Sequence, residues 1–166
     1  AKTAAMTLGQ LTTLQKNTGL LAMAAALETH ADTILAANTA DLAAASALPE
    51  KFVDRLALTK ARIADMAAGV RQVATLDDPT AQTDRAWVNE AGLTIAQKRV
   101  PLGVVGMIYE ARPNVTVDAA ALTFKSGNAV ILRGGKEALH SNLALATVLQ
   151  DALAAKGLPR DAVQLI

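Results

Sequence analysis

Apolar residues recur at helical spacing through residues 1–78 of the chain. Thr12, with Gln15 three positions later, has the pattern of a capping box, in which each side chain binds the backbone amide of the other residue. The apolar stripe that follows consists of Leu20, Met23, Ala24 and Leu27. With the segments that come next, this pattern predicts three or four amphipathic helices, which need a partner surface to cover their apolar faces.

Two further helices are predicted in this region. Asp32 can cap the first of them, whose face is mostly apolar. That face carries Ile34, Leu35, Asn38 and Leu42. Leu48-Pro49-Glu50 then breaks the run, because proline and the residue before it resist helical geometry. Thr59 begins the next helix, which stops at Asp77-Asp78-Pro79. Its stripe consists of Ile63, Met66, Val70 and Val73.

From Ala86 the pattern changes to that of strands. Trp87-Val88 and Leu93-Thr94-Ile95 flank the turn sequence Asn89-Glu90-Ala91-Gly92, which predicts a hairpin whose second strand runs on toward Val100. A long two-stranded ribbon is marginally stable alone and usually packs on another sheet or subunit. The hairpin is therefore a candidate oligomerisation arm, and an ordinary surface hairpin is an equal alternative.

Short strands and helices alternate in the rest of the chain. Val104–Tyr109, Ala129–Leu132 and Val163–Ile166 are predicted as strands, the first two of the buried, parallel type. Pro113 suits the first position of the helix between the first two strands, which closes at Ser126-Gly127-Asn128. The stripe of the second helix consists of Leu139, Leu143, Ala146, Leu149 and Leu153. This order predicts parallel pairing through right-handed crossovers.

The predicted fold class is therefore α/β. Residues 1–84 form a helical layer, residues 85–100 a β-hairpin arm, and residues 101–166 the first half of a Rossmann-like parallel-sheet cofactor domain. Because no Met precedes Ala1 and the chain stops directly after an apolar strand, we expect it to be a fragment.

Composition and charge exclude several classes of function. Sixteen Lys and Arg residues balance fifteen Asp and Glu residues without a block of like charge, so neither a nucleic acid nor an anionic membrane is an expected partner. No apolar run approaches the roughly 18 residues of a membrane span, and no secretory signal begins the chain. The absence of Cys excludes disulfides, and with two His residues no metal site is expected. These features predict a cytoplasmic protein.

Three blocks within residues 99–138 resemble one enzyme family. They are PLGVVG at Pro101–Gly106, IYEARPNVT at Ile108–Thr116 and KSGNAVILRGGKE at Lys125–Glu137. They resemble the gamma-glutamyl phosphate reductases, or glutamate-5-semialdehyde dehydrogenases, of the aldehyde dehydrogenase superfamily. Looser similarity extends upstream and downstream over nearly the whole chain. The family's chain is much longer, so the resemblance covers its N-terminal portion and implies an aldehyde dehydrogenase-like fold.

The resemblance also implies a reaction. The family uses NADPH to reduce L-glutamyl 5-phosphate to L-glutamate 5-semialdehyde with release of phosphate, a step of proline biosynthesis. A Cys thiolate attacks the acyl carbon and forms a thioester that is then reduced. This chain has no Cys, so we expect the nucleophile beyond Ile166 and no activity from the chain alone. A homo-oligomer is expected for the full-length protein.

Asn114 is the candidate catalytic residue. By resemblance, its side-chain amide donates to the oxygen of the substrate carbonyl, and such a preorganised donor typically lowers the barrier by about 3 kcal/mol. The alternative is that Asn114 caps the helix behind Pro113, because Asn is a favoured cap residue.

Arg133, Gly134, Gly135 and Lys136 form the candidate cofactor loop, and Ile108 is counted with them as cofactor-binding. The loop follows a strand at the carboxyl end of the predicted parallel sheet, where ligands bind. In the superfamily this loop meets the adenosine ribose of the nicotinamide cofactor. Two cations beside glycine backbone suit a ribose 2′-phosphate, which favours NADP(H) over NAD. A solvated basic turn is the alternative.

Other charged residues have weaker candidate roles. Arg112, beside Glu110, could orient the acyl phosphate or the carboxylate of the substrate, and an ion pair between the two is equally economical. Lys125 is expected to complement the dipole of its own helix. His30 and His140 lack an acidic partner nearby in sequence and are expected to be structural.

Gly103 and Gly106 are expected to allow close helix–strand packing, since the GxxG spacing is only a weak signal of nucleotide binding.

Two alternatives remain for the function of the chain. The chain could belong to another aldehyde or acyl-phosphate dehydrogenase of the superfamily, although generic members place a Pro-Trp-Asn type of turn where this chain has YEARPNVT. It could also be a noncatalytic nucleotide-binding or interaction module.

Overall fold

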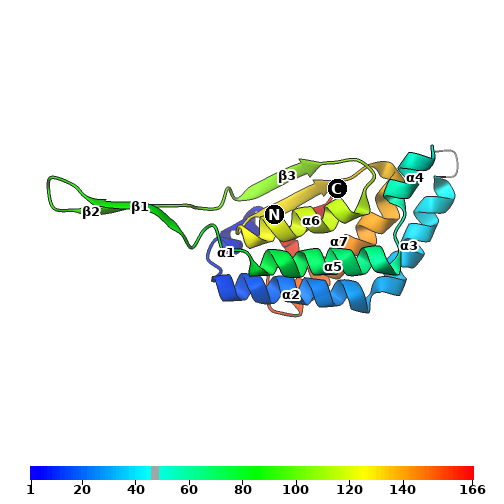
Figure 1. The fold of residues 1–166 in the computed structure, drawn as a ribbon, viewed down its shortest axis with the longest axis horizontal. Coiled ribbons are helices and arrows are strands. Elements are labelled where there is room, and N and C mark those ends of the chain that lie inside the picture. The colour runs from blue at the N-terminus through cyan, green and yellow to red at the C-terminus, as the bar shows by residue number, and fades with distance from the viewer. Residues whose placement is uncertain (46–48) are drawn as a thin grey trace.

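The computed structural model describes residues 1–45 and 49–166. A small parallel sheet lies along one side of the body, helices α2, α5 and α6 lie on one side of strand β3, and a two-stranded arm projects from one end (Figure 1). The helices are α1 (Lys2–Leu8), α2 (Thr13–Thr29), α3 (Ala31–Ala44), α4 (Glu50–Leu56), α5 (Lys60–Thr75), α6 (Pro113–Lys125) and α7 (Leu139–Ala154). The strands are β1 (Thr83–Val88), β2 (Thr94–Lys98), β3 (Val104–Ile108), β4 (Ala129–Arg133) and β5 (Val163–Leu165). The 3-10 turns η1 (Lys136–Ala138) and η2 (Arg160–Ala162) precede α7 and β5.

The sheet has the predicted parallel topology, in the order β3-β4-β5. Val105 pairs with Val130, and Val130 pairs with Val163. Helix α6 connects the first two strands, and α7 connects the next two. Gly127, at φ +75°, adopts the left-handed conformation that ends α6, as the Ser126-Gly127-Asn128 sequence predicts.

Local capping signals are confirmed at two helices. Thr12 and Gln15 form the reciprocal capping box of α2, and the Thr59 side chain accepts from the backbone amide of Arg62 at the start of α5. The prediction for Asp32 is wrong. Helix α3 begins directly after α2 without a side-chain cap, and Asp32 lies in its first turn, where it pairs with Lys60 at 2.9 Å.

Two short helices, α1 and α4, were not predicted. Each has seven residues, which is too short for a clear helical period. The break at Pro49 is confirmed as the N-cap position of α4, while Leu48 lies outside the described residues.

The helices and the inner face of the sheet share one hydrophobic core. Fully buried side chains include Leu20 and Leu27 of α2, Phe124 of α6 and Leu132 of β4. The predicted stripe of α7 is partly wrong. Leu139 and Leu143 are nearly half exposed, whereas its buried side chains are Ser141, Asn142, Leu145, Ala146, Val148, Leu149, Ala152 and Leu153. The face that α7 turns toward α2 and α3 is thus rotated from the one that the leucines suggest.

The prediction of two buried strands holds for β4 but not for β3. In β4, Val130 and Leu132 are fully buried. In β3, exposure alternates along the strand, and Val104 and Ile108 are 38% and 87% exposed. Successive strand residues point to opposite faces, and in the part of the chain that the structure describes no element covers the outer face of β3.

Strands β1 and β2 form the predicted antiparallel hairpin, with Trp87 opposite Ile95. Almost every residue of the two strands is exposed, because the arm stands clear of the body (Figure 1). Its root is fixed in the core. Lys16 of α2 binds both carboxylate oxygens of Asp78, at 3.0 and 2.9 Å, and the hydroxyl of Thr80 at 2.7 Å.

Within residues 1–45 and 49–166, no single helix is long and apolar enough to cross a membrane. Helices α2 and α3 pass that test as a pair by length and composition, but they are bent by 67° at their junction. Over the same residues, no group of three or more His, Asp or Glu side chains has the geometry to hold a metal ion.

Candidate functional site

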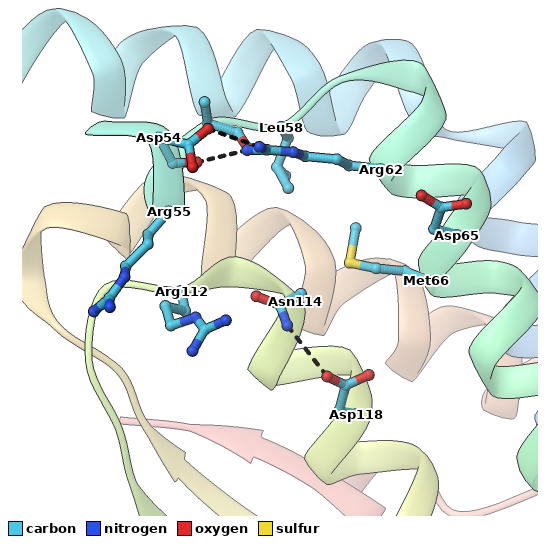
Figure 2. A pocket seen from close by; sticks show the side chains of 10 residues that line it. Asp54, Arg55, Leu58, Arg62, Asp65, Met66, Arg112, Asn114 and Asp118 are labelled. Carbon is cyan, nitrogen blue, oxygen red and sulfur yellow. Dashed lines mark hydrogen bonds and ion pairs between the residues drawn. The ribbon is translucent and has the colours of Figure 1, made fainter. Parts of the chain in front are cut away.

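A pocket of about 360 Å³ lies between the start of α6 and the segment that joins α4 to α5 (Figure 2). Its lining residues are Asp54, Arg55, Ala57, Leu58, Arg62, Asp65, Met66, Arg112, Asn114 and Asp118. Two segments far apart in sequence, 54–66 and 112–118, therefore form its walls. The second segment contains the candidate catalytic residue. No residue of the first segment was predicted to be part of a site.

Asn114 is the second residue of α6 and does not cap it. Arg112 occupies the N-cap position without a side-chain hydrogen bond, and Pro113 is the first helical residue. The Asn114 side chain instead donates from Nδ2 to Oδ2 of Asp118, one turn along the helix, at 3.3 Å (Figure 2). The capping alternative for Asn114 is therefore wrong.

Asp118 is a partly desolvated carboxyl group. Burial raises its pKa above the usual value, although the hydrogen bond from Asn114 and the charge of Arg112 act in the opposite direction. The environment thus favours the neutral form of Asp118 more than water does.

Glu110 and Arg112 form a local ion pair, which was one of the two alternatives for Arg112. Arg112 Nη1 lies 3.6 Å from one Glu110 oxygen, and Arg55 Nη1 lies 3.1 Å from the other. All three side chains are nearly half exposed, so these pairs contribute little to stability. Arg112 also lines the pocket, which leaves its guanidinium accessible to an anionic ligand.

Arg62 holds the first wall of the pocket together. Its guanidinium donates to the backbone carbonyl of Ala57 at 2.7 Å and to the Asp54 carboxylate at 2.7 Å (Figure 2). These bonds clamp the short link between α4 and α5. Arg62 therefore shapes the pocket, and both of its terminal nitrogens already donate to protein groups.

The candidate cofactor loop lies at the carboxyl end of β4. Arg133 is the last residue of the strand and pairs in register with Ile108, so the sheet brings these two predicted residues together. Arg133 Nη1 reaches the backbone carbonyl of Ile166 at 3.4 Å, and Lys136 is exposed at the start of η1. Neither cation pairs with a carboxylate in residues 1–45 or 49–166. Two uncompensated positive charges at this edge suit a phosphate group.

Gly134 and Gly135 allow close packing of this loop. A Cβ atom on Gly134 would overlap Nδ2 of Asn142, and one on Gly135 would lie 2.8 Å from the backbone nitrogen of Ala111. The packing role predicted for Gly103 and Gly106 is wrong, because a Cβ on either would meet nothing within 4 Å. Gly103 has φ +107°, a conformation that favours glycine.

A buried hydrogen-bond chain connects the candidate catalytic helix to the candidate cofactor loop. Thr116 of α6 donates to Oδ1 of Asn142 at 2.8 Å, so the Tyr109 hydroxyl donates to Thr116 Oγ1 at 2.7 Å. Burial raises the pKa of Tyr109, which keeps the phenol protonated. These hydrogen bonds connect the end of β3, the first turn of α6 and the start of α7 beneath Gly134.

Two charged residues bind partners that are distant in sequence. Lys125 is buried, and its Nζ donates to Asn17 Oδ1 at 2.7 Å and to the Ala74 carbonyl at 2.9 Å, so it caps α5 rather than complementing α6 alone. Burial lowers the pKa of Lys125. His140 contacts an acidic residue 99 positions away in sequence, because its Nδ1 lies 2.7 Å from the carboxylate of Asp41.

Asp41 of α3 caps helix α7, which has no cap in its own sequence. The buried carboxylate accepts from the backbone amides of His140 and Ser141 at 3.1 and 2.7 Å. A carboxylate at a helix N-terminus also stabilises the helix dipole. This cap helps to fix the start of α7 directly after the candidate cofactor loop.

Comparison with known proteins adds the following. A family model described as "Aldehyde dehydrogenase family" matches residues 1–166. The chain is 99% identical over 166 residues to a protein of Lacticaseibacillus casei named gamma-glutamyl phosphate reductase, covering all of this chain and 40% of that protein. Crystal structures of gamma-glutamyl phosphate reductases from Thermotoga maritima and Saccharomyces cerevisiae match with TM-scores of 0.97 and 0.93 at 41% and 35% identity. They are matched over 99% and 100% of this chain and 40% and 44% of their own. This chain thus spans about 40% of the length of such relatives.

Proposed function

The chain belongs to the aldehyde dehydrogenase family, and on that premise we propose that it is part of an enzyme that reduces L-glutamyl 5-phosphate to L-glutamate 5-semialdehyde. The reaction releases phosphate and is a step of proline biosynthesis. The observation that carries the substrate is the 99% identity to a protein named gamma-glutamyl phosphate reductase, over every residue of this chain. The Arg112 and Asn114 side chains in one pocket are consistent with an anionic acyl substrate.

Asn114 polarises the acyl group in this proposal. A Cys thiolate supplied by another part of the enzyme adds to the acyl carbon, and negative charge then develops on the carbonyl oxygen. Asn114 Nδ2 carries two hydrogens, of which Asp118 accepts one. The other is available to the carbonyl oxygen, where such a donor is worth about 3 kcal/mol. Phosphate leaves when the carbonyl re-forms as a thioester.

A nicotinamide cofactor, which the family implies, supplies the reducing equivalent for the thioester. We assign its binding to Ile108, Arg133, Gly134, Gly135 and Lys136. The two cations lack carboxylate partners among the described residues, and a guanidinium can hold a phosphate through two parallel hydrogen bonds. These features support NADP(H) rather than NAD. Glycines at 134 and 135 keep the backbone close to Asn142 and Ala111.

Substrate orientation falls to Arg112 in the same proposal. Its bond to Glu110 is long and exposed, so an acyl phosphate or a substrate carboxylate can replace it at little cost. Glu110 remains paired with Arg55 when this happens. Before the substrate binds, the ion pair with Glu110 limits the motion of the Arg112 guanidinium.

The arm is proposed to join subunits of a homo-oligomer of the full-length protein. Strands β1 and β2 expose both their side chains and their outer backbone edges, and Val88 and Leu93 are 64% and 63% exposed. Such a ribbon gains stability by packing on another sheet. In this proposal residues 1–84 and 101–166 belong to the cofactor domain, 85–100 form the arm, and the enzyme is cytoplasmic.

The test is an assay of the full-length protein that contains this chain. We expect phosphate-dependent reduction of NADP by glutamate semialdehyde, which is the reaction in reverse. A folded protein without this activity would reject the substrate and leave another aldehyde or acyl-phosphate dehydrogenase, or a noncatalytic module, as the function. Faster reduction of NAD than of NADP would reject the cofactor preference alone.

A further inference from the structure

Asn114 and Asp118 lie one turn apart on α6, and both line the pocket (Figure 2). The bond between them joins Nδ2 to Oδ2 at 3.3 Å. Asn114 has no other side-chain hydrogen bond within residues 1–45 and 49–166, and it does not cap α6. The contact with Asp118 is therefore the interaction that sets the orientation of its amide.

The two ends of an amide differ in what they can do for a carbonyl substrate. The NH2 group donates, whereas the amide oxygen accepts and would repel a developing oxyanion. The two ends have almost the same size, so packing alone does not select between them. An ionised carboxylate only accepts, and so it selects the orientation in which the NH2 group faces it.

The charge of an ionised Asp118 also acts on the reaction. A negative charge near a developing oxyanion opposes catalysis. Burial raises the pKa of Asp118, and the charge of Arg112, on the same pocket wall, acts in the opposite direction. The guanidinium thus offsets part of the negative charge of the carboxylate that holds the amide.

We propose that Asp118 is a positioning residue that fixes the Asn114 amide with its NH2 group toward the substrate carbonyl. This inference rests on the proposed function, because it requires Asn114 to be the carbonyl donor. A simple helix-surface pair, in contrast, would contribute slightly to helix stability and nothing specific to the reaction.

A double-mutant cycle in the full-length enzyme tests the proposal. Asp118→Leu keeps the approximate size of the side chain and removes the acceptor, and Asn114→Ala removes the donor. The kcat and KM of each single variant and of the double variant are measured with saturating NADP. We expect Asp118→Leu to lower kcat roughly tenfold in the wild-type background, with KM changed less than twofold, because part of a typical 10²–10³ donor effect is lost. In the Asn114→Ala background the same substitution changes kcat less than twofold.

Two outcomes would overturn this inference alone. They are an unchanged kcat in Asp118→Leu, or the same fold loss in both backgrounds, which would mean that Asp118 acts independently of Asn114. An unchanged kcat in Asn114→Ala would instead reject the proposed role of Asn114 and this inference with it. Asp151→Leu, an equivalent change in an exposed ion pair on α7, is the control for nonspecific effects. If Asp118→Leu does not fold, Asp118→Ser replaces it, because serine is polar but ends one bond short of the amide.

Discussion

Thr116 donates a 2.8 Å hydrogen bond to Asn142, so the first turn of α6 and the first turn of α7 are joined in the interior. Thr116 is fully buried and Asn142 is 2% exposed. Helix α6 carries the candidate catalytic residue Asn114, and α7 follows the candidate cofactor loop at the end of β4. The bond therefore sets the spacing between the two halves of the proposed site.

Thr116→Val is expected to destabilise the protein by roughly 1–3 kcal/mol. The substitution keeps the shape of the side chain but leaves Asn142 Oδ1 and the Tyr109 hydroxyl without their partner, and unsatisfied buried polar groups cost that much. Denaturant unfolding of the full-length protein measures the change. Thr116→Ser, which keeps the hydroxyl, is the control and should cost less. Equal stability of the Val variant and the wild type would show that the hydrogen bond makes no net contribution to the free energy of unfolding.

Asp78 is expected to make stability depend on pH in the acid range. Burial alone would raise its pKa, but hydrogen bonds from Lys16, Thr80 and Thr13 outweigh burial and lower the pKa from 3.8 to about 2. A carboxyl group with a lower pKa in the folded state stabilises the protein above its unfolded pKa, and this stabilisation is lost as the pH falls through the folded pKa. We therefore expect a loss of roughly 2 kcal/mol between about pH 5 and pH 2.

Unfolding free energies measured across this range for the wild type and Asp78→Asn provide the check. The variant should be less stable near pH 7 and should show a flatter pH dependence between pH 5 and pH 2. The same pH dependence in both proteins would contradict the assignment to Asp78. Because Asp78 and Thr80 precede β1, the variant should also loosen the root of the arm.

Gly134→Ala is expected to weaken NADP binding. The new methyl group would overlap Nδ2 of Asn142 and approach the Tyr109 ring to 3.1 Å, so the loop must shift outward. Overpacking of this kind typically costs 1–3 kcal/mol, which corresponds to a roughly 5- to 150-fold change if it falls entirely on the bound state. Equilibrium titration with NADP measures the dissociation constant. Gly69→Ala, where a Cβ meets nothing within 4 Å, is the matched control.

Arg133→Ala is expected to reduce the preference for NADP over NAD. A hydrogen bond to a charged group contributes roughly 1.5–3 kcal/mol, so the dissociation constant for NADP should rise by about 10- to 150-fold. Binding of NAD should change little, because it has no 2′-phosphate. Equal weakening for both cofactors would assign Arg133 a general role in the loop instead.

The features that were predictable from sequence are those that depend on neighbouring residues. The capping box at Thr12, the helix start at Thr59 and the first-turn proline at Pro113 were predictable because their signals lie within a few positions. The strands and their parallel pairing followed from short apolar runs between helices. The exposure of Ile108 was missed, because an apolar run does not reveal whether both faces of a sheet are covered.

The features that could not be predicted depend on tertiary contacts. Asp41 caps a helix that begins 98 positions later, and Lys125 binds the end of a helix 51 positions earlier. Likewise, Asp54–Met66 form a pocket wall only because α5 packs against α6. A sequence signal was available for one missed residue. Asp118 follows Asn114 by four positions, which places both on the same face of the predicted helix.

The central claim is that the Asn114 amide stabilises negative charge on the carbonyl oxygen of the substrate. The most direct test is the kcat of full-length Asn114→Ala with saturating glutamate semialdehyde, phosphate and NADP. Gln72→Ala, which removes an exposed amide on α5 outside the pocket, serves as the control. A kcat lower by about 10²–10³, with KM nearly unchanged and thermal stability retained, is the predicted result. A kcat equal to that of the Gln72→Ala control would contradict the claim.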